Sequence, residues 1–180
     1  IIAKPDCVLI RPMIRQSASD LIEKLQQFGI TVISLQPTTA GELYQYWEQL
    51  GIICGKQQEA FEMTHSFQQY LSEFKANISS IPENERPRVY FESIHSRMKT
   101  FSPESIAIFA LESAGGINVA TDAIPRRNTN IASYSKEKIL SRAGEIDVFL
   151  AQQGRMNRIS IETIEDEPGF GAIKAVRNKQ

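Results

Sequence analysis

The chain has 180 residues, a formal net charge of −1, and 42% hydrophobic and 23% charged residues. These values are ordinary for a globular protein with a substantial core, and the near-zero charge argues against a nucleic-acid-binding face or a polybasic membrane surface. No run of residues approaches the roughly 18 apolar residues that span a bilayer.

The first forty residues predict a strand–helix–strand unit. Asp6–Ile10 is a short apolar run typical of a buried strand, and Ser17–Phe28 repeats apolar residues at helical spacing before Gly29, a typical helix C-cap. Ile30–Leu35 is rich in β-branched residues and predicts the next strand. Strands connected in this way normally form a right-handed parallel crossover.

Two helices are expected to follow. The first begins at Thr39 and stops at Gly51. The second runs from Lys56 to Ile78 without Gly or Pro and carries one stripe of apolar and aromatic side chains. A helix of that length spans on the order of 35 Å, which is enough to connect two lobes as a strut.

The polar stretch Ser80–Pro87, with two prolines, predicts a junction before a second lobe. Beyond it, strands and helices are expected to alternate. The expected elements are a strand at Arg88–Ser93, a helix at Pro103–Ala114 with Ser102 as N-cap, a long loop at Ile117–Tyr134, a helix at Ser135–Arg142, a strand at Ile146–Ala151, a helix at Ile159–Ile164, and a turn with a short segment at Pro168–Gln180.

One pattern occurs twice in the chain. Ile1–Ile10 and Lys138–Leu150 each carry a helix-ending apolar pair, a small residue, a basic residue, a turn, an Asp and a strand. Two such units imply two lobes. The first copy begins in what should be the last turn of a helix, so we expect the chain to be part of something longer.

Six short motifs occur in order along the chain. They are Lys4-Pro5-Asp6, Leu50-Gly51, Gly55, Gly115-Gly116-x-Asn118, Ser135-x-Glu137, and Pro168-Gly169 with Ala175-Val176-Arg177-Asn178. This series resembles the helical-backbone class of periplasmic substrate-binding proteins, which are the binding components of ABC importers for ferric siderophores, haem and cobalamin. The resemblance covers essentially the whole chain.

The resemblance implies an α/β fold of two Rossmann-like lobes joined by a single long helix, with the N-terminal lobe incomplete. The implied divisions are 1–38 for the remnant of the N-terminal lobe, 39–81 for the helices including the strut, and 82–180 for the C-terminal lobe. It implies a periplasmic or lipid-anchored extracytoplasmic location, with the signal segment absent from these residues.

The implied ligand is a ferric siderophore or related iron chelate, held in a cleft between the lobes and delivered to the membrane permease. Cobalamin or haem is the alternative ligand. The siderophore ranks first because Arg97, Lys99 and Arg155 suit an anionic ligand. No further cofactor is implied.

Candidate ligand-binding residues follow the predicted strands, because ligands bind outside the carboxyl ends of strands in open α/β sheets. Arginine and lysine could pair with chelate oxygens, and Tyr134 could stack on an aromatic chelator. Solvated loops, and packing of Tyr134 within the lobe, are the alternatives. The candidates are Glu92, Ser93, His95, Arg97, Lys99 and Thr100 in one set, Tyr134, Gln152, Gln153 and Arg155 in a second, and Arg126 and Arg127 as weaker members.

Glu137 lies in the first turn of a predicted helix. By the resemblance, the matching acidic residue docks against an arginine of the permease. The helix dipole alone also favours an acidic residue at this position, so both interpretations stay open.

Other function classes find little support. The chain has no Gly-x-Ser-x-Gly elbow, phosphate loop or dinucleotide fingerprint, so we do not expect an enzyme. His65 and His95 are too few for a bare-metal site. Cys7 and Cys54 are expected to pack as small hydrophobic residues, with a disulfide as the alternative.

Two rival hypotheses remain. One is a flavodoxin-like α/β enzyme or signalling domain, which would use the same strand–helix alternation. The other is self-association through exposed sheet edges, because unpaired edges attract another copy of the chain.

Overall fold

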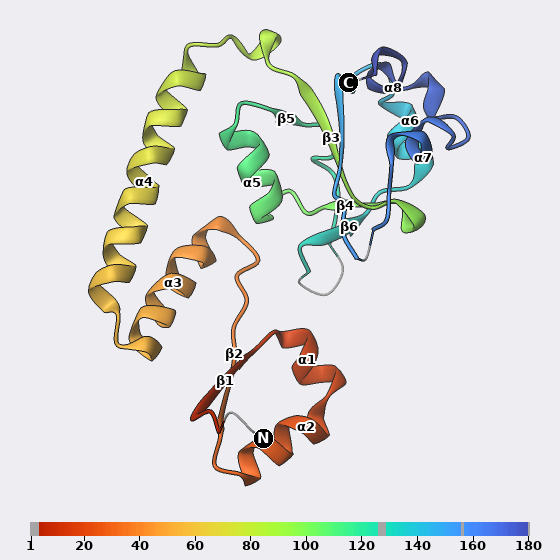
Figure 1. Ribbon diagram of the computed structural model, residues 1–180. Helices are drawn as coiled ribbons and strands as arrows, with labels where there is room; N and C mark the ends of the chain where they lie inside the picture. Colours follow the sequence, from red (N-terminus) through yellow and green to blue (C-terminus); the bar gives the residue numbers. More distant parts are fainter. Residues whose placement is uncertain (1–3, 126–128, 156, 180) are drawn as a thin grey trace.

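The computed structural model describes residues 4–125, 129–155 and 157–179. Figure 1 shows a small N-terminal unit, a pair of helices (α3 and α4) and a C-terminal α/β lobe. The longer helix of the pair, α4, leads to the lobe. The α/β fold expected from the sequence, with one long helix connecting its parts, is confirmed.

The N-terminal unit is built on two parallel strands. β1 (Cys7–Ile10) pairs with β2 (Thr31–Ser34), as expected. The helix expected at Ser17–Phe28 is confirmed as α2 (Ser19–Gln27), but the sequence interpretation missed a further short helix before it, α1 (Pro12–Ser17). Ala18 separates them with φ −140° and ψ 46°, a non-helical conformation.

Helix α3 (Ala40–Cys54) begins as expected and ends later than expected. The side chain of Thr39 accepts from the Glu42 backbone N–H, and Glu42 reaches back in a capping box. The predicted end at Gly51 is wrong: the helix continues to Gly55, whose φ of 64° makes it the C-cap. Gly51 is instead a point of close packing, because a Cβ there would lie 2.6 Å from the Cβ of Ala60.

Helix α4 (Gln57–Ser79) confirms the predicted strut. Its Phe67 packs edge-on against Trp47 of α3, with ring centroids 5.2 Å apart. Arg86 closes its C-terminal end by donating to the carbonyl oxygens of Ile78 at 2.9 Å and Ile81 at 3.0 Å. A 3₁₀ turn at Glu83–Glu85 follows within the expected junction.

A five-stranded sheet forms the centre of the C-terminal lobe. Its strands are β3 (Arg88–Ile94), β4 (Lys99–Phe101), β5 (Ile117–Asn118), β6 (Ile131–Ser133) and β7 (Val148–Ala151). β3 is parallel to β5 and β7 and antiparallel to β4, which pairs in turn with β6. The long loop expected at Ile117–Tyr134 is wrong, because it contains β5 and β6.

Short helices cover the sheet (Figure 1). They are α5 (Ile106–Ser113), α6 (Lys136–Ser141), α7 (Ile161–Glu165) and α8 (Lys174–Asn178). The helix start expected at Pro103 with Ser102 as N-cap is wrong: Ser105 is the N-cap of α5 and accepts from the Ile108 N–H at 3.3 Å.

The core of the lobe lies between the sheet and the C-terminal segments. Tyr90, Tyr134 and Phe170 are its largest fully buried side chains. Asp147, just before β7, connects β3 with α8: its carboxylate accepts from the Arg88 backbone N–H at 2.9 Å and from Lys174 Nζ at 2.5 Å. The second copy of the repeated pattern therefore fixes both β3 and α8.

Both cysteines are free. Cys7 is half-buried, whereas Cys54 is exposed at the end of α3, so the expectation that Cys54 packs inside is wrong. Across the described ranges, no helix combines the length and apolar character required to cross a membrane.

Gly51→Ala tests the close contact between α3 and α4. Although alanine favours a helix, the added Cβ is expected to lower the free energy of unfolding by about 1–3 kcal/mol, because the neighbouring helix must move. Urea unfolding of the complete protein measures the change. Gly41→Ala is the matched control, since a Cβ at Gly41 meets nothing within 4 Å. A Gly51→Ala variant as stable as the control would contradict the interpretation.

Candidate functional site

The ends of β3 and β7 define one edge of the C-terminal sheet. The two strands run parallel, with Glu92 opposite Ala151 in the last pair of the register. We name residues 95–98, after β3, the β3–β4 turn, and residues 152–155 with 157–160, after β7, the β7–α7 loop. Ligands of open α/β sheets bind outside the carboxyl ends of strands, so this edge is the first candidate site.

The first set of predicted residues contains both exposed and buried side chains. Arg97 is exposed in the β3–β4 turn, and Lys99 is half-buried at the start of β4. Glu92, Ser93 and His95 are buried, with exposures of 0%, 3% and 7%. Glu92 and Ser93 belong to β3 itself, in agreement with the strand predicted at Arg88–Ser93, and not to the loop after the strand.

Two further polar residues of this set have partners inside the lobe. Thr100 is fully buried and donates to the carbonyl oxygen of Phe91 at 2.8 Å. Lys99 donates to Ser133 Oγ at 2.5 Å, which holds its side chain along the β4–β6 pair. Of the first set, Arg97 is therefore the side chain most free to meet a ligand.

Glu92 and His95 belong to a chain of ionisable side chains that continues to Glu167 and Lys136. His95 Nδ1 lies 3.1 and 3.0 Å from the two carboxylate oxygens of Glu92. His95 Nε2 lies 3.3 Å from Glu167 Oε2, and the other oxygen of Glu167 accepts from Lys136. Phe170 packs edge-on against the imidazole, at 6.0 Å between ring centroids. This chain joins β3 to α6 and to the segment after α7.

The two carboxylates of this chain have opposite pKa shifts. Burial raises the pKa of Glu92, because a charged carboxylate without water is unfavourable, and the adjacent His95 offsets only part of this effect. The hydrogen bond from Lys136 holds the pKa of Glu167 below its ordinary value. Of the two carboxyl groups, Glu92 is therefore the one that more readily keeps a proton.

Tyr134 does not present the ring surface that ligand stacking would need. Its side chain is 1% exposed, and its ring packs against Tyr90 at 5.8 Å between centroids. Its hydroxyl donates to Asp122 Oδ1 at 3.0 Å, and burial raises the pKa of Tyr134 to about 12. The ring therefore belongs to the core, which was the alternative interpretation.

The β7–α7 loop lines an open hollow of about 590 Å³. Gln152, Gln153 and Arg155 are exposed in this loop, as expected. Arg158, which the sequence interpretation missed, also faces the hollow. The lining residues are Gln153, Gly154, Arg155, Arg158, Ile159, Ser160 and Thr163. Two arginines at one hollow can bind an anion, because each guanidinium offers a planar pair of donors.

Polar cavities also lie between the C-terminal lobe and the start of α3. Thr39 forms a β-bridge with Ser105, which brings the two parts into contact. A cavity of about 230 Å³ lies beside this bridge. It is lined by Thr38, Thr39, Glu42, Ser102, Glu104, Ser105, Pro125, Thr129 and Asn130. Sequence reasoning missed this contact, since nothing in the sequence pairs Thr39 with Ser105.

A larger hollow of about 630 Å³ adjoins this cavity and shares Thr38 and Glu42 with it. It lies at the carboxyl ends of β1 and β2, where Arg11 donates to Gln36 Oε1 at 3.1 Å. The polar surface thus continues from the N-terminal unit to the C-terminal lobe. Arg126 and Arg127 lie outside the described residues.

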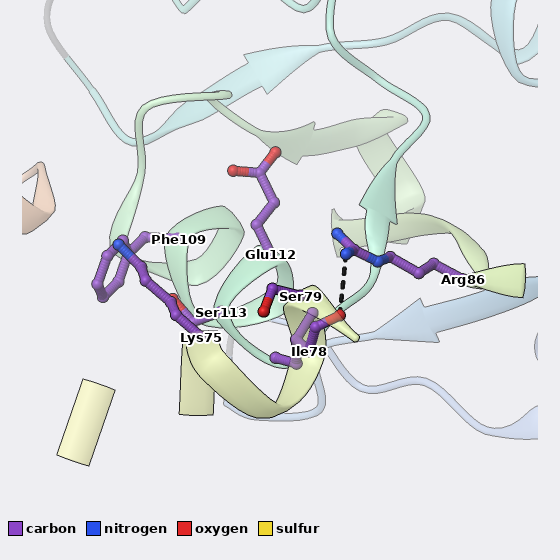
Figure 2. Close-up of a pocket in the computed structure, with 7 residues that line it drawn as sticks. All are labelled: Lys75, Ile78, Ser79, Arg86, Phe109, Glu112 and Ser113. Carbon is purple, nitrogen blue, oxygen red and sulfur yellow. Dashed lines mark hydrogen bonds between the residues drawn. The ribbon is translucent and has the colours of Figure 1, made fainter. Parts of the chain in front are cut away.

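Figure 2 shows a different cavity, of about 270 Å³, where α4 meets α5. Its lining includes Lys75 and Ile78 of α4, Glu112 of α5, and Arg86, whose bond to the Ile78 carbonyl is the dashed line. Arg86 precedes β3, so this cavity lies near the amino end of that strand, away from the β3–β4 turn. We assign it to the joint between strut and lobe.

Glu137 is exposed in the first turn of α6. A hydrogen bond with the Ser135 side chain lowers the pKa of Glu137, so its carboxylate is charged at neutral pH. An exposed, charged carboxylate suits contact with a cationic partner, and it equally suits the helix dipole.

The described residues contain no group of three or more His, Cys, Asp or Glu side chains placed to hold a metal ion. His65 lies on α4, where its ring stacks on Phe61 at 6.2 Å between centroids.

One family model matches almost the whole chain. Residues 2–180 match the family described as periplasmic binding protein. The chain is 25% identical to the uncharacterized ABC transporter substrate-binding lipoprotein YvrC of Bacillus subtilis, over 97% of this chain and 53% of that protein. The chain thus spans about half the length of the curated relative it matches.

Two solved structures share the fold over 99% of this chain and 66% of their own. One is a possible iron-binding (periplasmic solute-binding) protein from Staphylococcus epidermidis, with a TM-score of 0.76 and 24% identity. The other is the periplasmic haem-binding protein HutB of Vibrio cholerae, with a TM-score of 0.77 and 18% identity.

Glu92→Gln tests the buried carboxyl group. Because the pKa of Glu92 is raised in the folded protein, its protonated form stabilises the fold. The wild type loses this stability as pH rises above about 4.3, the ordinary pKa of a glutamate side chain. The variant cannot ionise. Its free energy of unfolding relative to wild type is therefore expected to rise between about pH 4 and pH 7, as measured by urea unfolding. The exposed Glu112→Gln is the control, and a relative stability that falls with pH would contradict the assignment.

Proposed function

The chain belongs to the periplasmic binding protein family, and on this premise we propose that it is part of the substrate-binding component of an ABC importer. The component would capture a small molecule between two lobes and deliver it to a membrane permease. This role is binding without catalysis. An extracytoplasmic, lipid-anchored location agrees with the matched lipoprotein of Bacillus subtilis.

One observation carries the proposal. The carboxyl ends of β1 and β2 and the carboxyl ends of β3 and β7 each adjoin polar hollows, and the bridge between Thr39 and Ser105 brings the two parts of the chain together. Open α/β sheets bind ligands at such edges, so these two edges support a ligand site between the two parts of the chain.

A ferric siderophore or a similar anionic iron chelate is the ligand class that we propose first. Arg97, Arg155 and Arg158 are exposed at the sheet edge, where they can pair with carboxylate, catecholate or hydroxamate oxygens. A chelate brings its own metal ligands, which agrees with a site built from cations. The possible iron-binding protein of Staphylococcus epidermidis supports this choice by its shared fold.

Haem is the second candidate. The shared fold with the haem-binding protein of Vibrio cholerae favours it, and haem carboxylates could pair with the same arginines. The burial of Tyr134 argues against it, because no stacking ring is offered at that position to a flat macrocycle. Cobalamin remains a weaker alternative for the same reason.

Arg155→Ala combined with Arg158→Ala tests the ligand edge. If both guanidiniums contact an anionic chelate, the double variant is expected to bind at least about tenfold more weakly, since charge-assisted hydrogen bonds contribute about 1.5–3 kcal/mol each. Calorimetric titration of the complete protein with ferric siderophores, haem and cobalamin measures the affinity. Arg177→Ala is the control, because Arg177 is an exposed residue of α8. Wild-type protein that binds none of these ligands would refute the proposal.

Glu137→Gln tests the proposed contact with the permease. The loss of the charge is expected to reduce ligand-dependent transport, or ATPase activity of the reconstituted importer, while ligand affinity stays unchanged. Glu162→Gln is a matched control, because Glu162 is also exposed in a first helical turn and a serine hydrogen bond lowers its pKa in the same way. Equal effects of both substitutions would contradict a specific docking role.

A further inference from the structure

Asn157 is buried in a loop whose neighbouring polar residues are exposed. Its side chain is 6% exposed, whereas Gln152, Arg155 and Arg158 in the same β7–α7 loop are exposed. A buried amide is unfavourable unless its donor and acceptor are both used. Here both are used.

The amide of Asn157 connects the two loops of the candidate site. Its Oδ1 accepts from the backbone N–H of His95, in the β3–β4 turn, at 2.9 Å. Its Nδ2 donates to the backbone carbonyl of Gln152, at the start of the β7–α7 loop, at 2.7 Å. A backbone N–H can only donate and a carbonyl can only accept, so these partners fix the orientation of the amide.

The backbone of Asn157 also closes the loop that carries Arg155. Gly154 donates to the Asn157 carbonyl at 3.0 Å, and the Asn157 N–H donates back to the Gly154 carbonyl at 3.2 Å. Arg155 therefore extends from a closed turn, and Arg158 follows directly after the buried amide. The positions of both arginines depend on where Asn157 is held.

The β3–β4 turn is fixed around the same amide. Met98 has a φ of 45°, in the left-handed region that non-glycine residues rarely adopt, so the turn needs external support. Inside the turn, the Met98 N–H donates to the His95 carbonyl at 2.9 Å, and from outside it the Tyr134 N–H donates to the Met98 carbonyl at 3.0 Å. His95 is itself held through its ring by Glu92 and Glu167 and through its N–H by Asn157. Arg97 projects from this fixed turn.

We propose that Asn157 is a positioning residue, which sets the separation between the β3–β4 turn and the β7–α7 loop and thereby aligns Arg97 with Arg155 and Arg158 for one anionic ligand. The inference rests on the proposed function, because it takes the sheet edge as the ligand site. Asn157 need not touch the ligand. Its effect acts through the backbone of the two loops.

Asn157→Ala and Asn157→Asp together test this role in the complete protein. The probes are haemin and a ferric hydroxamate chelate, of which the one that binds wild type is used throughout. Asn157→Ala leaves the His95 N–H and the Gln152 carbonyl without their partner, so affinity is expected to fall about tenfold at every pH. Amide hydrogen exchange at His95 is expected to become faster.

Asn157→Asp supplies a readout that a general packing defect would not give. The ionised carboxylate still accepts from the His95 N–H but repels the Gln152 carbonyl, so affinity is expected to be low at pH 7. The protonated carboxyl group can donate to that carbonyl again, so affinity relative to wild type is expected to recover toward pH 4. The ionisable groups beside the turn that Asn157 holds are Glu92, His95 and Glu167. Expressing each value relative to wild type at the same pH removes the titration of the ligand.

The outcomes separate this inference from the proposed function. Wild-type binding that neither Asn157 substitution changes would overturn the positioning role and leave the proposed function standing. Wild-type protein that binds neither probe, nor any other chelate, would refute both the positioning role and the proposed function. A loss in Asn157→Asp that does not recover at low pH would also contradict the role. Asn178→Asp, on exposed α8, controls for the added charge.

Discussion

Strand β3 is hydrogen-bonded along both edges and buried on both faces, and the rest of the C-terminal lobe depends on it. β7 lies along one edge, while β5 and then β4 share the other. Val89, Tyr90, Glu92 and Ser93 are all buried. A strand without a solvent-facing side cannot turn a polar residue toward water. The protein must therefore supply partners for Glu92, and this requirement brings His95 and the segment after α7 to the base of the candidate site.

The sequence predicted those elements whose length made their periodicity visible. α4 was predictable because its apolar stripe extends over 23 residues. β5 and β6 have two and three residues, too few for any alternation to show, so they are strands only because β3 and β4 offer them edges. The predicted helix end at Gly51 was wrong because a glycine suits both a helix end and a close contact between two helices. Only the position of Ala60, on another helix, distinguishes the two.

The sequence predicted where in the fold the candidate site lies, but not which of its side chains are buried. The rule that ligands bind beyond strand ends placed Arg97 and Arg155 correctly at the sheet edge, because that rule needs only the order of strands. The burial of His95 and Tyr134 depends on Glu167 and Asp122, whose contacts arise only when the lobe folds. Asn157 was missed for the same reason, since its two partners lie in different loops.

The site thus combines a rigid backbone with adaptable side chains. Buried hydrogen bonds hold the β3–β4 turn and the β7–α7 loop, so little backbone entropy remains to be lost when a ligand binds. The arginines above them have long side chains that can adjust to ligands of different outline while keeping their charge. Under the proposed function, ligand preference can then change through exposed loop residues alone, while the buried hydrogen bonds that hold the two loops stay the same.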